Sequence, residues 1–198
     1  MIPNEEQARA LWDKYQLPEG KRRHVELVAR VALFLAQHID KVTKRHINQS
    51  LLQAAALLHD IDKNILMLSR ETHPDAAVRI LNEEGMGEVA ALVATHPLHA
   101  ILAGSDLREL QGQTPVDPAI CPKTWEEKLL FLADKMVKDD VIGVDARFAL
   151  WNEEHQTTEE QAILDAAYPK VKELEKEILA FVDTTSEDVA RVVKREYP

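Results

Sequence analysis

The sequence predicts an all-α fold, and three observations lead to this prediction. Apolar side chains recur at three- and four-residue spacing through most of the chain, as on the buried face of an amphipathic helix. Alternating apolar and polar runs, which are typical of strands, are few. Ser, Thr and Asn residues stand just before many of the helical segments, where their side chains can cap a helix. We therefore expect roughly eight to ten helices, with no internal repeat.

The first three predicted helices lead to a segment that is apolar on nearly every side. Asn4 can cap a short helix through about residue 15, and a second helix spans about residues 19–39 with one apolar face. Asn48 can cap a third helix, which spans about residues 51–59. Because a helix that is apolar all round must be buried, this third helix is expected at the centre of the fold.

Two shorter helices and a loop follow. Pro74 suits the first turn of a helix that ends at Glu84 and Gly85, and residues 87–95 form the next helix before a turn at His96. Glycines and prolines then punctuate residues 104–123, which predicts a loop. A loop of this length could be a lid that selects a substrate, or simply a long connection.

A capping box marks the return to helical structure. Thr124 and Glu127 have the spacing at which each side chain can bond the other's backbone N–H, and they open a helix through about residue 138. Residues 145–154 form another short helix with the same kind of periodic pattern.

The C-terminal part is expected to consist of two more helices. Thr158 would cap a long helix to about residue 182, bent or broken near Pro169, and Ser186 would cap a last helix over residues 187–196. Apolar positions at helical spacing in residues 171–181 could form a dimer or partner surface, or pack back on the domain.

Composition limits the classes of partner. The chain has 198 residues, a net charge of −10 and a pI near 5.3. This excess of negative charge argues against extensive binding of nucleic acid or of an anionic membrane. A local basic site for a small anion is still compatible with it, because such a site needs only a few cations. The single cysteine, Cys121, permits no intrachain disulfide, which fits a reducing compartment. The first residues lack the features of a signal peptide, and no apolar run approaches the ~20 residues that span a bilayer. A cytoplasmic location is expected.

The end of the central apolar helix carries two groups that can ligate a metal. His59 and Asp60 follow the apolar run of residues 54–58 directly. An ionised carboxylate that is buried without a partner costs several kcal/mol or more. Something cationic must therefore lie beside Asp60, and the choices are a metal, an Arg or Lys side chain, or bulk water at the helix end.

The same arrangement recurs elsewhere in the chain. Asp134 follows the apolar run of residues 129–133, and His24 shares the apolar stripe of its helix. His73 immediately precedes one predicted helix, and His96 closes another, with His99 three residues on.

Each of these residues has an ordinary structural explanation when it is taken alone. A histidine on an apolar face is usually a hydrogen-bonded core residue, and an aspartate at a helix end is commonly solvated or paired with a lysine such as Lys63 or Lys135. Taken together, four histidines and two aspartates on five helices all point toward the core, and structural roles explain that poorly.

The order of these residues resembles the HD-domain superfamily of metal-dependent phosphohydrolases. Residues 56–63, ALLHDIDK, resemble its central signature, residues 73–81 its next block, and residues 130–135, LFLADK, its closing block. The resemblance covers residues 20–140. It implies a helical bundle around a buried metal site, with residues 1–198 as a single HD-like domain. In that domain a metal-binding core of residues 20–140 would carry a helical C-terminal extension of residues 141–198.

The resemblance also implies the ligands. A first metal would be held by His24, His59, Asp60 and Asp134. Members with a second metal add two histidines, which match His73 and His96 here, with Asp60 bridging and His99 as the alternative to His96. One or two divalent ions of Mn, Fe, Co, Ni or Zn suit such mixed imidazole and carboxylate ligation.

The implied activity is hydrolysis of a phosphate ester or anhydride of a small, nucleotide-like molecule by a metal-activated water. Asp60 would bridge the metals and orient the nucleophile, while Lys63 would contact phosphate or be a solvated turn residue. Arg147 is a weaker candidate, for which a surface position is favoured. The expected partner is a small phosphorylated substrate, without nucleic acid or membrane, and a homodimer is possible.

The sequence departs from the family pattern at one position, and two other functions remain open. Many relatives carry Gly where this chain has Asp62, which could be a solvated turn residue, a lysine partner or an orienter of a ligating histidine; we favour the solvated position.

The same ligands could hold a di-iron pair that oxidises a substrate with oxygen. A non-catalytic nucleotide or metal sensor is the second alternative.

Overall fold

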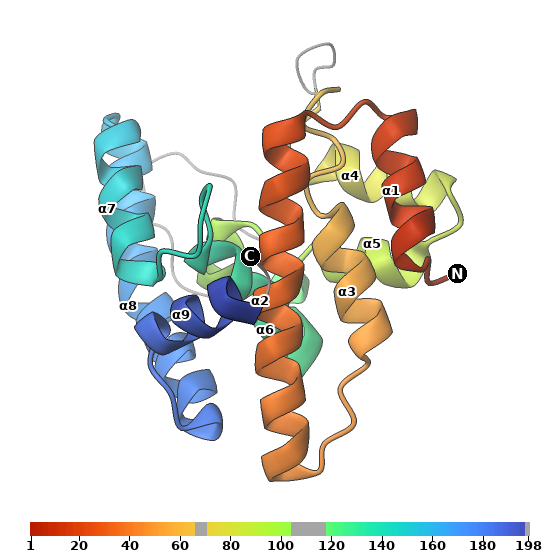
Figure 1. Cartoon of the computed structure of the whole chain (residues 1–198). Coiled ribbons are helices and arrows are strands. Elements are labelled where there is room, and N and C mark those ends of the chain that lie inside the picture. Colours follow the sequence, from red (N-terminus) through yellow and green to blue (C-terminus); the bar gives the residue numbers. More distant parts are fainter. Residues whose placement is uncertain (66–70, 104–117, 197–198) are drawn as a thin grey trace.

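The computed structural model describes residues 1–65, 71–103 and 118–196, and the regular structure in these ranges is helical (Figure 1). They contain nine α-helices and two short 3-10 helices. The only β-type pairing in these ranges is an isolated bridge between Val137 and Val141. The predicted all-α fold is confirmed.

The bounds of the elements follow the chain in order. They are α1 (Glu5–Lys14), α2 (Glu19–Thr43), α3 (Gln49–Leu58), α4 (Asp75–Glu83), α5 (Gly87–Val93), the 3-10 helices η1 (Leu98–Leu102) and η3 (Pro118–Ile120), α6 (Trp125–Met136), α7 (Val144–Glu154), α8 (Thr158–Val182) and α9 (Ser186–Glu196).

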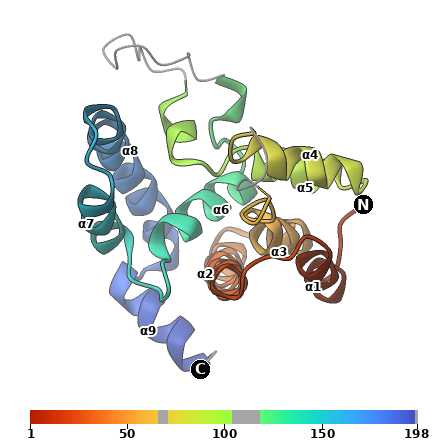
Figure 2. The ribbon, with the colours of Figure 1, turned by 90° about the horizontal axis from the view of Figure 1, so that it is seen from above.

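The long helix α2 is the axis of the bundle. It packs against α3, α6, α8 and α9. Seen from above in Figure 2, α1, α3, α4 and α5 lie to one side of the molecule and α7 and α8 to the other, with α6 between them. The two groups of helices thus face each other across α2 and α6, and the residues on those two helices can contact both.

The central position predicted for α3 is confirmed. All residues from Ala54 to Leu58 are buried, and so are all residues from Leu129 to Ala133 on α6. The small side chains of α3 let neighbouring helices approach closely, since interaxial distance depends on the side chains at the contact. His59 and Asp60 follow the end of α3, and Asp134 lies on α6 directly after its buried run, so polar groups adjoin the core at both places.

Two helix caps lie one residue earlier than predicted. Thr157, and not Thr158, caps α8, because it forms the reciprocal capping box with Glu160. Similarly, the Oγ1 of Thr185 accepts a hydrogen bond from the backbone N–H of Asp188, and α9 already includes Ser186. In a run of adjacent Ser and Thr residues the cap is decided by which hydroxyl can reach the N–H three positions on.

Other boundaries differ by a few residues. Helix α2 continues to Thr43 and α5 ends at Val93. Pro74 precedes α4 directly, which begins at Asp75. Helix α8 is not broken at Pro169, because the flanking Ala167 and Val171 are fully buried and hold the helix against its neighbours.

Residues 104–117 of the predicted loop lie outside the described residues. Residues 118–120 of that loop form the short helix η3. Among the described residues, none of the helices has the length and apolar character that crossing a membrane requires.

Candidate metal centre

The structure brings all six candidate ligands together where the core ends. They come from α2, from the segment after α3, from the residue pair before α4, from the segment after α5 and from α6. Their donor atoms form three overlapping groups, and within each group the atoms lie within 4.8 Å of one another. The groups are His24, His59 and Asp60; His59, His96 and Asp134; and Asp60, His73 and His96. This proximity fits the predicted centre, while the role of each residue as a ligand stays a prediction.

The first part of the cluster surrounds Asp134. Its Oδ1 lies 3.1 Å from Nε2 of His24 and 3.5 Å from Nε2 of His59. The Oδ2 of Asp60 completes this part at 4.0 Å from Nε2 of His24. Two imidazole nitrogens and two carboxylates thus face one small volume.

The second part of the cluster lies on the other side of Asp60. The Nε2 atoms of His73 and His96 are 2.9 Å apart, and Oδ1 of Asp60 lies 3.7 Å from Nε2 of His73. Because its two oxygens face different histidines, the Asp60 carboxylate has the orientation that bridging two ions requires.

All four histidines present the same nitrogen to the cluster. The Nδ1 atoms of His24, His59 and His96 lie 3.1, 2.8 and 2.5 Å from backbone carbonyl oxygens, which can only accept a hydrogen bond. Nδ1 of His73 is 3.0 Å from both oxygens of Asp62. Each Nδ1 can therefore donate its proton to an oxygen, and each Nε2 is the nitrogen turned toward the cluster, where it could ligate a cation once it is deprotonated.

The charges in the cluster favour a bound cation. Burial raises the pKa of Asp60, but the charges of His59 and Lys63 outweigh burial and hold that pKa well below its usual range. Burial also raises the pKa of Asp134, but Lys135 and His24 outweigh burial and hold that pKa well below its usual range. Both carboxylates stay ionised, as metal ligands must.

Two of the histidines differ in their tendency to bind a proton. Burial, followed by the charges of His59 and His73, lowers the pKa of His96 well below its usual value, so this imidazole stays neutral. Burial also opposes the charged form of His59, but Asp60 and Asp134 reverse this effect and raise its pKa. The carboxylates therefore attract a positive charge to this position, and a metal ion can supply it in place of the proton.

One nitrogen of His59 lacks a hydrogen-bond partner among the described residues, and this indicates whether a metal ion fits the cluster. Nε2 of His59 is buried and has no hydrogen-bond partner in the part of the chain that the structure describes, because the 3.5 Å to Asp134 is too long for a good hydrogen bond. A buried polar atom without a partner costs about 1–3 kcal/mol. Imidazole nitrogens and carboxylates are a donor set that divalent transition metals prefer, so the residues fit the predicted ion.

Asp62 is fully buried, so the favoured solvated position was wrong. Its side chain is 0% exposed, and both of its oxygens contact Nδ1 of His73. This contact matches the third explanation, an orienter of a candidate ligand. The sequence could not show it because His73 lies 11 residues away, and local spacing does not predict a contact at that separation.

Replacing Asp62 with asparagine is expected to weaken the second part of the cluster selectively. The amide keeps the size of the side chain but removes the charge that fixes and polarises His73, and loss of such a partner typically costs 10–100-fold in metal affinity. Calorimetric titration with Mn²⁺ measures this loss. A matched control is Asp139→Asn, on an exposed residue. Unchanged affinity in both variants would leave Asp62 without a role in metal binding.

Three lysines contact the aspartates of the cluster. Nζ of Lys21 lies 3.0 Å from Oδ2 of Asp60, and Nζ of Lys63 lies 3.4 Å from Oδ1. Lys135 donates to Asp134 at 2.5 Å and to the carbonyl of His96 at 2.8 Å. Sequence reasoning missed Lys21, although its spacing of three residues from His24 places both on one helix face.

A cavity of about 360 Å³ opens over the cluster. Cationic side chains, among them Lys21, Lys63 and Arg147, line it together with the apolar Leu98, Trp151, Ile163 and Leu164. His99 lines the cavity as well, but its nitrogens belong to none of the three donor groups. Among the described residues His96, rather than His99, thus lies in the position of the sixth ligand.

Comparison with known proteins gives one match. A family model described as HD domain matches residues 22–188, which is most of the chain and extends beyond residues 20–140, where the sequence resemblance is found. Neither the curated proteins nor the solved structures yield a match.

Proposed function

The chain belongs to the HD-domain family, whose members are generally hydrolases, and we propose that it is a metal-dependent phosphohydrolase that acts on a small, nucleotide-like molecule. The observation that carries the proposal is the convergence of four imidazole Nε2 atoms and two ionised carboxylates beneath a cavity lined with cations. A purely structural role explains such a concentration of imidazoles, carboxylates and cations poorly, whereas a site that binds a metal ion beside an anion explains it.

The six candidate ligands would hold two metal ions, an arrangement that suits phosphoryl chemistry. His24, His59, Asp60 and Asp134 would hold one ion, and His73 and His96 with Asp60 would hold a second. Bound divalent ions lower the pKa of a coordinated water and neutralise phosphoryl oxygens. Asp60, between the two positions, would orient that water through the oxygen that faces it.

Lys21 and Lys63 are the proposed phosphate contacts. Both ammonium groups now lie against Asp60, whose charge an ion would neutralise. Because each lysine is partly exposed on the wall of the cavity, it can then turn its N–H donors toward phosphate oxygens. The apolar Leu98, Ile163 and Leu164 would contact the organic part of the substrate.

The test is phosphate release from a panel of nucleotides and sugar phosphates, with protein loaded separately with Mn²⁺, Co²⁺, Fe²⁺, Ni²⁺ and Zn²⁺. We expect release that requires metal, stops with a chelator and resumes when the metal is restored. Turnover that persists in chelator would contradict the proposal. Oxygen consumption by iron-loaded protein without phosphate release would favour the oxygenase, and metal-dependent nucleotide binding without either would favour the sensor.

A further inference from the structure

Arg147 is a half-buried cation on the wall of the cavity. It lies in the first turns of α7, and its Nε and Nη1 atoms are buried without a hydrogen-bond partner among the described residues. The proposed metal centre does not use it. Sequence reasoning favoured a surface position for this residue; the residue is half-buried, and it is its Nε and Nη1 atoms that lie beneath the surface.

The surroundings of Arg147 make this arrangement costly. Burial lowers the pKa of its guanidinium, against the opposing field of Asp134. The residue also lies near the N-terminus of α7, where the helix dipole disfavours a positive charge. A buried charged donor without an acceptor is expensive, so an anion is expected to pair with it when the protein binds its ligand.

Trp151 holds the guanidinium in place. The Cζ atom of Arg147 lies 4.3 Å from the centre of the Trp151 ring, one turn further along α7. A guanidinium over an aromatic ring has one face covered, while its N–H donors lie in its plane and point away from the ring. The ring contact thus fixes the orientation of the guanidinium plane, whose N–H donors match the oxygens of an anionic group.

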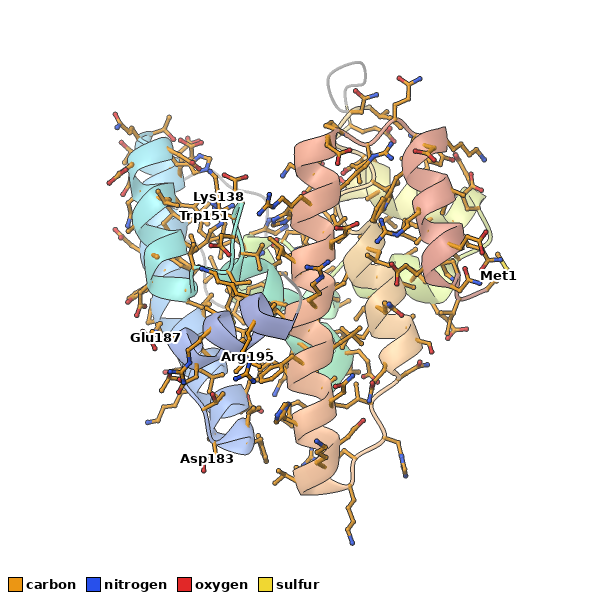
Figure 3. The ribbon with its side chains drawn as sticks, in the orientation of Figure 1. Met1, Lys138, Trp151, Asp183, Glu187 and Arg195 are labelled. Atoms are coloured by element: carbon orange, nitrogen blue, oxygen red, sulfur yellow. The ribbon has the colours of Figure 1, made fainter. Side chains whose placement is uncertain are left out.

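Arg147 also lies where two cavities adjoin. It lines the 360 Å³ cavity over the metal ligands and a neighbouring cavity of about 520 Å³. Lys21, His24, Trp151 and His155 line both as well. Trp151 and Lys138, which lines the second cavity, lie in the region between α7 and α2 in Figure 3. A ligand that extends from the metal ligands toward the second cavity would pass Arg147.

We propose that Arg147 binds a second anionic group of the substrate, separate from the phosphoryl group at the metal centre. This inference rests on the proposed function and narrows its substrate class to molecules with at least two phosphoryl groups. Lys21 and Lys63 already flank Asp60 and serve the phosphoryl group held there. Arg147 comes from another helix and lies along the path away from it, so its partner is the next phosphoryl group.

The experiment compares two probes that are not hydrolysed, inorganic phosphate and methylenediphosphonate, by calorimetry with Mn²⁺-loaded protein. We expect the diphosphonate to bind the unmodified protein more tightly. In Arg147→Met its affinity should fall by about tenfold or more, the usual effect of losing a charged hydrogen bond, while phosphate affinity stays the same. The control is Arg191→Met, whose side chain is 76% exposed and should affect neither probe.

Ligand-free stability provides the second readout. Methionine fills a similar space without a buried charge, so Arg147→Met should melt at the same temperature as the unmodified protein or higher. A lower melting temperature would assign Arg147 a structural role and overturn the inference. An equal loss of affinity for both probes, or no loss for the diphosphonate, would also overturn it.

The proposed function and this inference can fail separately. Both probes report binding, so their result does not depend on turnover. Metal-dependent hydrolysis with an unchanged diphosphonate affinity in Arg147→Met would leave the hydrolase standing and remove the second anion site. A selective loss of diphosphonate affinity without any hydrolysis would keep the site and remove the hydrolase.

Discussion

Asp60→Asn is expected to abolish metal-dependent phosphate release and to remove the bound metal. Asp60 is 4% exposed, and its two carboxylate oxygens face the two parts of the cluster, so two ions could share this ligand. An asparagine keeps the volume but is neutral and ligates metals poorly. Because a metal ion contributes several kcal/mol to such catalysis, the rate should fall by about a thousandfold or more.

Metal content and turnover must be measured on the same preparations to test this result. The control is Asp13→Asn, an aspartate whose side chain is 74% exposed in a surface ion pair with Arg22. Such pairs contribute about 0–1 kcal/mol, so metal content and rate should not change in the control. An Asp60→Asn protein with its full metal content and full rate would exclude Asp60 from the centre.

Lys135→Met is expected to produce the largest loss of stability, and the loss should depend on metal. The Lys135 ammonium is 3% exposed and bonds both the Asp134 carboxylate and the His96 carbonyl. Its Nζ also lies 4.8 Å from the centre of the Phe131 ring. Removing one partner of a buried pair leaves the other charge uncompensated, which costs about 3–5 kcal/mol. This is the loss expected in the free energy of unfolding of the metal-free protein.

In the metal-loaded protein the substitution should lower the free energy of unfolding by less, because an ion at Asp134 replaces part of the missing charge. Urea unfolding with a chelator and with Mn²⁺ measures both values. Lys128→Met is the matched control, since Lys128 pairs with Glu177 on the surface and should cost no more than about 1 kcal/mol. Equal losses with and without metal would show that Lys135 acts only through packing.

The sequence was informative at several places where the deciding interactions are local, although two caps lie one residue from the predicted position. Capping boxes at Thr124 and at Asn4 depend on residues three positions apart, and the helices they open begin where they were expected. The six candidate ligands could be chosen because each is a polar residue that interrupts an apolar pattern at a helix end or on a buried stripe. The family followed from the order of these residues, and the family match confirms it.

Long-range contacts were decided by tertiary structure alone. Nδ1 of His24 faces the carbonyl of Lys138, 114 residues away, and Asp62 contacts His73, 11 residues away. Neither contact follows from periodicity, because helical spacing specifies which face a residue occupies but not what packs against that face. Arg147 shows the same limit, since a lone arginine near a helix start resembles any surface charge until α2 and α8 close around it. The sequence by itself determined the helices and the chemical groups of the site. Only packing determined which groups are buried, paired or left without a partner, because burial depends on elements that are distant in the chain.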